Sequence, residues 1–294
     1  MNTRLNAGSW YVLAAGIFWG TTGTAQAFAP EGAQPLVVGA LRLAVAGTAL
    51  VPYAFARGVL PSSQRWSFVP LSVAALSMAA YQPLFFGAVA TTGVALGTIV
   101  AIGSAPVIAG ALTWIVSGDQ PTSRWVVATA LAILGTALLF AGQSEIGVSI
   151  GGVALAIGAG AAYAVYVVAS KSLLEAHEPD AVIAVVFGLS ALMLLPILFV
   201  ADIGWALTPG GAAAVLYLGL FATSAAYILF VRGLNLLPVG STVTLSLAEP
   251  LTAAALGVIL LSERLGLAGA LGAVLLLTGL TVIGLRPSRS TKES

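Results

Sequence analysis

The chain repeats itself at a spacing of 144 residues. Prolines and glycines, which restrict or release the backbone, recur at this interval. The matching pairs are Pro35 with Pro179, Pro52 with Pro196, Pro106 with Pro250, Gly8 with Gly152, Gly16 with Gly160, and Gly135 with Gly279. Between these anchors the register slips by two residues, so that Tyr81 matches Tyr227, and then recovers. A repeat of this length predicts two duplicated units, which we place at residues 1–145 and 146–294.

Composition places both units in a membrane. Apolar residues make up 59% of the chain and charged residues 7%, and a soluble protein of 294 residues could not expose such a surface. The net charge of +1 gives no reason to expect a nucleic-acid partner. Cysteine is absent and His177 is the single histidine, so we expect no metal and no cofactor. The oligomeric state stays open.

Polar, proline or glycine breaks divide the chain into ten apolar segments. Each is close to the roughly 20 residues that cross a bilayer. The segments are residues 9–29, 35–56, 67–90, 94–117, 124–142, 149–172, 181–201, 210–232, 238–261 and 266–286. The first is too long for a signal-peptide core and is interpreted as a retained helix. We therefore predict an all-α integral membrane protein with ten transmembrane helices.

The basic residues predict an orientation. Arg264 falls on the side opposite the N-terminus, and Arg42 lies inside the second segment. The others share the side of the N-terminus: Arg4, Arg57, Arg65, Arg124, Lys171, Arg232, Arg286, Arg289 and Lys292. Basic loops face the cytoplasm, so we expect both termini there. Because each half has five helices, the second half must enter from the opposite face, which predicts an inverted repeat with a pseudo-two-fold axis in the membrane plane.

Particular residues carry a resemblance to a known family. They are the Trp19-Gly20 pair, Arg42, and the stretch 247–284, in which Glu263 follows Pro250 by 13 positions and a glycine-rich last helix comes next. The first half repeats this ending from Pro106 through Asp119. With these motifs, the five-plus-five arrangement resembles the EamA-type members of the drug/metabolite transporter superfamily. The first half departs from the pattern in one place, where Gln120 follows Asp119.

The resemblance implies export of small metabolites or drugs through a central cavity. That cavity would be lined mainly by the first four helices of each repeat, with the fifth helices at the periphery. Among bacterial members the chain most resembles the YddG-type amino-acid exporters, which favour aromatic and other neutral amino acids. The resemblance also implies that the chain is a multi-pass protein of the bacterial inner (plasma) membrane.

Three pairs of stripes are candidates for the cavity wall. Residues spaced by three or four positions share a helix face, and polar tips in a membrane must point into the bundle. The stripes are Trp19, Thr22 and Gln26 with their partners Tyr163, Tyr166 and Ser170; Ser77, Tyr81 and Phe85 with Ser224 and Tyr227; and Thr242 and Ser246. The alternative is polar contacts between helices together with an aromatic belt at the membrane surface.

Two charges lie inside predicted spans. Glu249 is the single carboxylate deep within one, and it shares a face with Thr242 and Ser246. It could exchange a proton during the cycle, contact a substrate amino group, or form a structural ion pair. Arg42 could hold a substrate carboxylate, pair with a carboxylate of the protein, or reach the membrane surface. By contrast, Glu175, His177, Glu178 and Asp180 are expected in a solvated loop.

Pro106 and Pro250 lie inside corresponding helices. Each removes a backbone hydrogen bond, so we expect a break or hinge at both positions or, alternatively, static kinks.

The leading hypothesis is a secondary transporter that exports a small neutral or zwitterionic metabolite, most often an amino acid, by alternating access. The alternatives are an exporter of drugs or purines and a non-transporting membrane protein. An enzyme is not expected, because the chain has no G-x-x-x-x-G-K-[ST] motif and no pair of histidines. Proton-coupled and facilitated transport both stay open.

Overall fold

The described part of the chain is helical. The computed structural model describes residues 3–27, 30, 32–61, 64–141, 149–260 and 266–284, without the side chains of 3–6, 26–27 and 94–95. These residues contain no strand. The α-helices are α1 (Thr3–Gly20), α2 (Thr22–Ala27), α3 (Pro35–Ala56), α4 (Phe68–Thr92), α5 (Val94–Ser117), α6 (Ser123–Phe140), α7 (Ile150–Leu173), α8 (Pro179–Val200), α9 (Pro209–Gly219), α10 (Ala226–Leu236), α11 (Val239–Leu245), α12 (Ala248–Leu260) and α13 (Leu267–Gly284). A 3₁₀ turn η1 (Gly204–Leu207) precedes α9, and a π-helical turn η2 (Leu220–Ala225) joins α9 to α10.

Nine helical spans among the described residues are long and apolar enough to cross a membrane. Seven of them lie in α3 to α8 and α13, and the other two, Pro209–Leu236 and Val239–Leu260, are compound. The first predicted segment is divided at Thr21, whose hydroxyl donates to the Phe18 carbonyl at 2.6 Å. The predicted all-α, multi-span architecture is confirmed.

The structure contains one of the two expected proline breaks. The ninth predicted segment, residues 238–261, is interrupted at Ser246 and Leu247, between α11 and α12. Pro250 has no N–H for the Ser246 carbonyl, which instead accepts from the Glu249 N–H at 3.0 Å in a tighter turn. The expected break at Pro106 is absent, because α5 continues through this residue. A hinge at Pro106 stays a prediction.

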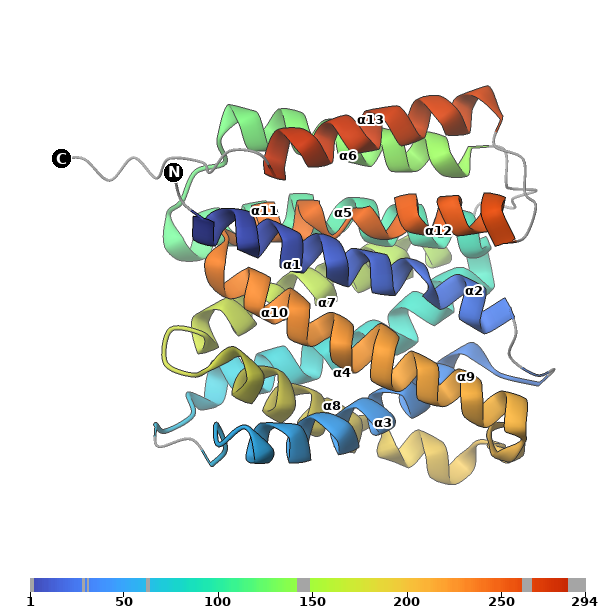
Figure 1. Cartoon of the computed structure of the whole chain (residues 1–294). Coiled ribbons are helices and arrows are strands. Elements are labelled where there is room, and N and C mark those ends of the chain that lie inside the picture. The colour runs from blue at the N-terminus through green and yellow to red at the C-terminus, as the bar shows by residue number, and fades with distance from the viewer. Residues whose placement is uncertain are drawn as a thin grey trace.

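The connections place the basic residues of the described loops at one end. Arg57, Arg65, Arg124, Lys171 and Arg232 lie near the same end of the bundle as the start of α1, on the left of Figure 1. Arg264, Arg286, Arg289 and Lys292 lie outside the described residues. Which end faces the cytoplasm stays a prediction from the basic-residue count.

Corresponding helices of the two halves pack against one another. α3 packs on its repeat partner α8, and α6 packs on its partner α13. The contact of α4 with α7 is repeated by that of α1 with α10, and the contact of α5 with α7 by that of α12 with α1. Such paired contacts are those of two units related by an approximate two-fold axis. The predicted two-repeat organisation is therefore visible in the packing (Figure 1).

Repeat-related glycines make the same close crossings. A methyl group at Gly16 would lie 2.9 Å from Ala248 Cβ and 3.2 Å from Glu249 N. One at Gly160 would collide with Ser104 Oγ and lie 3.3 Å from Ala105 N. Ser104 and Ala105 are the repeat partners of Ala248 and Glu249, so one geometry occurs twice. Glycine at both positions lets the helix backbones approach closely.

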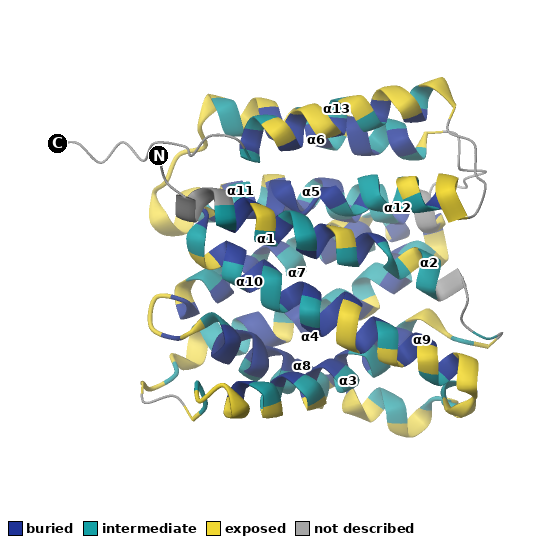
Figure 2. Cartoon of the chain, in the orientation of Figure 1, coloured by how far each residue is buried: buried dark blue, intermediate teal, exposed yellow. Residues whose placement is uncertain are grey.

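The outer surface of the bundle is apolar. Exposed residues cover the outward faces of the peripheral helices, while the buried ones gather inside (Figure 2). Phe199 and Val200 at the end of α8 and Ile115 on α5 are each more than three-quarters exposed. In water such a surface would aggregate, whereas in a bilayer it meets lipid. The interior is thus left as the region where polar groups can act.

Candidate functional site

A cavity of about 470 Å³ lies between the two halves. Its inner part is lined by residues from the middle of the helices, such as Arg42, Tyr81 and Tyr227. Its outer part is lined by Thr22, Gly23 and Thr24 of α2 and by Pro35 at the start of α3. These outer residues lie at the end of the bundle far from the start of α1. The cavity therefore opens toward that end.

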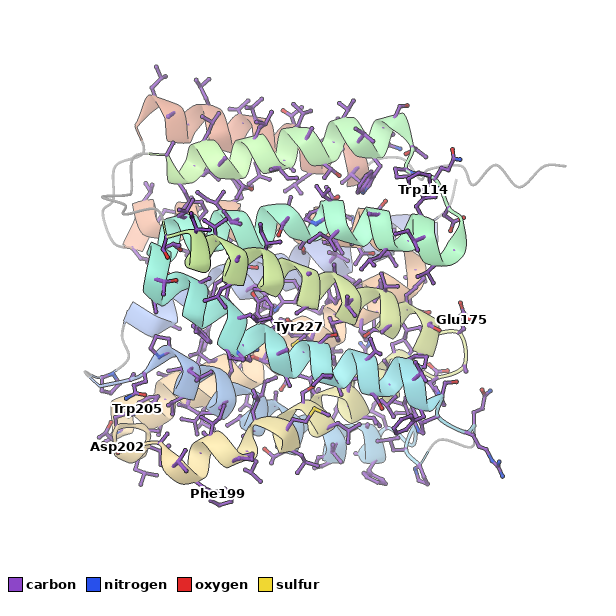
Figure 3. The ribbon with its side chains drawn as sticks, turned by 180° about the vertical axis from the view of Figure 1, so that it is seen from behind. Trp114, Glu175, Phe199, Asp202, Trp205 and Tyr227 are labelled. Carbon is purple, nitrogen blue, oxygen red and sulfur yellow. The ribbon has the colours of Figure 1, made fainter. Side chains whose placement is uncertain are left out.

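Aromatic rings from both repeats form one wall of the cavity. The ring centroid of Trp19 lies 4.8 Å from that of Tyr227 and 6.5 Å from that of Tyr163, in an edge-to-face arrangement. Tyr81 lies 6.2 Å from Tyr163 and stacks on Phe85 at 5.5 Å. Figure 3 shows Tyr227 in the middle of the bundle. The two aromatic pairs that the repeat identified, Trp19 with Tyr163 and Tyr81 with Tyr227, thus lie together in one wall.

Two opposite charges also line the cavity. Arg42 comes from the first half of α3, and Glu249 from the first turn of α12. In the described part of the chain the two side chains form no ion pair with each other. The Arg42 Nε–H donates instead to Thr223 Oγ1 at 3.1 Å. A guanidinium and a carboxylate therefore line the same cavity without pairing with each other.

The predicted residues divide into two groups by depth. Trp19, Thr22, Tyr81, Phe85, Tyr163, Tyr227, Ser246, Glu249 and Arg42 line the cavity. Ser77, Tyr166, Ser170, Ser224, Thr242, Pro106 and Pro250 do not line it. The side chain of Gln26 lies outside the described residues. Helical spacing predicts which face a residue occupies, but the position along the helix axis decides whether that face meets the cavity or closed packing.

The second group shows why depth matters. Ser170 and Thr242 are fully buried in α7 and α11, toward the end at which α1 begins. Tyr166 is fully buried against the rings of Phe187 and Tyr227. Ser224 uses its hydroxyl within its own helix, donating to the Gly219 carbonyl at 2.8 Å. Substrate contact by any residue of either group stays a prediction.

Sequence reasoning missed several lining residues. Gln82 lies beside Tyr81 in mid-span, but its repeat partner is Ile228, so a search for recurring residues passes over it. Its amide in the middle of an apolar segment was the available signal. Leu139 and Phe140 show that α6, a fifth helix, also reaches the cavity. Small residues of α5 and α12, among them Ala101 and Gly257, leave the space that the larger side chains surround.

The opposite end of the bundle is held by a charged cluster. Asp180 accepts from Arg232 Nε at 3.0 Å and from Nη2 at 2.7 Å, and its side chain is only 7% exposed. The Tyr53 hydroxyl donates to Asp180 Oδ2 at 3.2 Å and accepts from Arg232 Nη2 at 3.0 Å. Arg57 Nε lies 3.6 Å from Asp180. The expectation of a solvated Asp180 is therefore wrong, because α8 begins at Pro179 and turns this carboxylate inward.

This cluster joins α3, α8 and α10 and is not repeated at the other end. The repeat partner of Asp180 is Leu36, that of Tyr53 is Ile197, and that of Arg232 is Phe86. None of these can form an ion pair. The polar closure is thus specific to one end of the bundle.

The loop beside the cluster holds the single histidine. The His177 ring stacks on Trp66 with the centroids 3.8 Å apart, and the side chain is buried. Burial lowers the pKa of His177 below its ordinary value of 6.5, because it disfavours the charged imidazolium. Glu175 lies on the surface at this end (Figure 3). The expected solvated loop is therefore correct for Glu175 and Glu178 and wrong for His177 and Asp180.

Within the described ranges, no group of three or more histidine or acidic side chains could hold a metal ion. The chemistry available in the cavity is therefore that of a cation, a carboxylate, amide and hydroxyl groups, and aromatic faces. These groups can bind a small polar molecule.

Comparison with known proteins agrees with this geometry. The model of the EamA-like transporter family matches residues 6–141 and 150–285. The uncharacterised transporter YwfM of Bacillus subtilis is 48% identical over 97% of this chain and 96% of its own length. The threonine/homoserine exporter RhtA of Salmonella typhimurium is 35% identical over 78% of this chain and 74% of its own length. A solved crystal structure that covers 95% of this chain has a TM-score of 0.82 at 21% identity, which shows a shared fold.

Proposed function

Because this chain belongs to the EamA-like transporter family, we propose that it exports small zwitterionic metabolites, above all amino acids, by alternating access through the central cavity. Membership makes the chain a transporter and not an enzyme, and a multi-pass protein of the plasma (inner) membrane. The substrate class and the mechanism are the proposal.

The observation that carries the proposal is the unpaired opposition of Arg42 and Glu249 in one cavity. A buried charge is costly unless a partner of opposite sign is present. A zwitterion supplies both partners, because its carboxylate can pair with Arg42 and its ammonium with Glu249. A planar guanidinium suits a carboxylate, since it can donate two parallel hydrogen bonds.

The aromatic wall supports a preference for ligands with flat or apolar side chains. Rings of Trp19, Tyr81 and Tyr163 offer faces for stacking and for contact with a cation. The volume of about 470 Å³ is within the range for small-molecule sites. The RhtA relatives are named for threonine and homoserine, which supports amino acids as a class. An aromatic preference is our further expectation.

Alternating access follows from the repeat. If the two halves exchange conformations, the cavity closes at its present mouth and opens at the end held by Asp180. The Asp180 cluster must then break, because it joins α3 of one half to α8 and α10 of the other. In this conformation it serves as the closed gate. Ser170 and Thr242, now buried behind that gate, would line the pathway in the alternate state.

Flux into proteoliposomes tests the proposal. Vesicles carrying the purified protein are preloaded with an unlabelled amino acid, and uptake of labelled L-phenylalanine and L-threonine is followed by counterflow. Saturable uptake of either is expected, and a raised KM for this uptake in Arg42→Gln would connect it to the cavity. An imposed pH gradient, applied to wild type and to Glu249→Gln, distinguishes proton coupling from facilitated exchange. Saturable flux of a purine or a cationic dye, with none for any amino acid, would refute the proposed substrate class.

A further inference from the structure

The amide of Gln82 is buried in the cavity wall with its oxygen unsatisfied. The residue is 1% exposed, and Oε1 has no hydrogen-bond partner among the described residues. Leaving a buried acceptor without a donor is costly, and natural structures contain few such groups. Gln82 also lines the cavity. Its oxygen is thus an acceptor without a donor in the cavity wall, and a turn of the side chain toward the cavity would present it to a ligand that carries an N–H group.

Gly39 sets the place of this amide against α3. A methyl group at Gly39 would lie 2.8 Å from Gln82 Oε1 and 2.7 Å from Phe86 Cε2, so a larger residue would push both side chains of α4 away. Arg42 follows Gly39 by three positions and shares its helix face. The guanidinium of Arg42 and the amide of Gln82 therefore border the same part of the cavity.

The π-helical turn η2 fixes one side of Arg42. Thr223 is fully buried, and its hydroxyl donates to the Leu218 carbonyl, five residues earlier, at 2.7 Å. The same oxygen accepts from Arg42 Nε at 3.1 Å. In the part of the chain that is described, Arg42 makes no other hydrogen bond, so its two terminal amino groups stay available. Single π-helical turns occur often at functional sites, and here the turn places a hydroxyl where Arg42 needs it.

We propose that Arg42, Gln82 and Thr223 form a subsite for the amino-carboxylate head of an amino acid. The terminal N–H groups of Arg42 donate to the ligand carboxylate, and Gln82 Oε1 accepts from the adjacent ammonium. Thr223 is a positioning residue, which holds Arg42 in the orientation that the carboxylate requires. Glu249 attracts the ammonium from α12. This assignment rests on the proposed function and extends it to two residues that the repeat comparison did not identify.

The test uses three ligands that separate the two ends of the head group. L-phenylalanine carries both groups, 3-phenylpropionate only the carboxylate, and 2-phenylethylamine only the ammonium. Affinities are measured by isothermal titration calorimetry on the detergent-purified protein. If wild type binds L-threonine more tightly than L-phenylalanine, the corresponding three compounds built on threonine are used.

The two variants should weaken different ligands. Gln82→Leu should weaken L-phenylalanine and 2-phenylethylamine about tenfold or more, the fold-change for losing one hydrogen bond to a charged group, and leave 3-phenylpropionate unchanged. Thr223→Val should weaken L-phenylalanine and 3-phenylpropionate and leave 2-phenylethylamine unchanged. Thr223→Ser keeps the hydroxyl and should restore binding. Thr48→Val, a matched change on the exposed face of α3, should have no effect.

The outcomes test the proposed function and the proposed subsite separately. Wild-type binding of neither amino acid would overturn the proposed function. Wild-type binding, with equal losses for all three ligands in Gln82→Leu or in Thr223→Val, would overturn the subsite alone, because a misfolded or rearranged cavity does not discriminate. A variant that fails to purify as a folded protein is replaced by Gln82→Met or Thr223→Ala, to which the same criteria apply.

Discussion

Breaking the Asp180 cluster should open the end of the bundle at which α1 begins. Asp180→Asn keeps the shape of the side chain but removes the charge that Arg232 and Arg57 share. Removing one partner of a fully buried ion pair costs about 3–5 kcal/mol. Because Arg232 is 32% exposed and regains some hydration, we expect Asp180→Asn to lower the stability of the cluster by roughly 2–3 kcal/mol. If that loss falls on the closed conformation, the population open at this end rises by about 30- to 150-fold.

The absence of cysteine makes this change measurable without a background. A single Ser170→Cys substitution places a thiol in a fully buried position near the last turn of α7, at the same end of the bundle as the cluster. Its rate of modification by a maleimide, measured on detergent-solubilised protein, reports how often this end opens. Adding Asp180→Asn should accelerate modification by about 30- to 150-fold. Arg232→Gln should give a similar acceleration, and the double variant should add little to either, because the two residues form one interaction.

Two controls separate the gate from general loosening. Asp202→Asn makes the same chemical change at the opposite end of the bundle, where Asp202 is exposed and lies near Trp205 (Figure 3), and it should leave the rate unchanged. Arg57→Gln removes the longer, more exposed contact and should have a small effect, below about 1 kcal/mol. The reasoning would be refuted by an unchanged rate in Asp180→Asn, or by an equal acceleration in Asp202→Asn.

Three further outcomes are expected. Burial lowers the pKa of His177, so the neutral imidazole stabilises the fold above a pH of about 6.5 and this stabilisation is lost as the pH falls. His177→Phe should therefore reduce the fall in melting temperature between pH 7 and pH 5. An unchanged dependence of the melting temperature on pH would contradict this. Gly135→Ala would bring a methyl group to 2.5 Å from Leu276 N and should lower the free energy of unfolding by about 1–3 kcal/mol, whereas Gly151→Ala, with no neighbour closer than 3.8 Å, should be neutral in the same thermal assay. Arg42→Gln should raise the KM for amino-acid counterflow about tenfold or more, whereas the matched change at exposed Arg65 should not; equal KM values in the two variants would argue against Arg42 as the carboxylate contact.

Several parts of the site were predictable because they recur. Trp19 with Tyr163, and Tyr81 with Tyr227, share helix faces at repeat-related positions, and both pairs line the cavity. Gln82 has no such recurrence, because its partner is Ile228, and the partner of Thr223 is Ser77, which does not line the cavity. Symmetry identifies the features that both halves need for packing and switching. A ligand with two different ends must be held by residues that differ between the halves, so the repeat cannot reveal them.

Depth along the helix axis was the other property of the site that the sequence could not predict. Trp19 and Ser170 belong to matching stripes, yet one borders open space and the other is closed off. Helical periodicity reports an angle around the axis and contains no information about which end of a two-ended pathway is closed. The prediction for Asp180 failed for a related reason. A charge next to a proline at the end of a loop is typical of a solvated turn, and the local sequence does not show that this carboxylate is buried between helices.

By itself, the sequence determined the membrane class, the helical spans and the duplication, because these depend on local hydropathy and on spacings along the chain. The tertiary structure alone decided that the cavity opens at one end, that Asp180 joins three helices at the other, and that Arg42 and Glu249 line one cavity without pairing. These features arise between helices far apart in the sequence. Their energies depend on distance and burial across the two halves, which no pattern within either half contains.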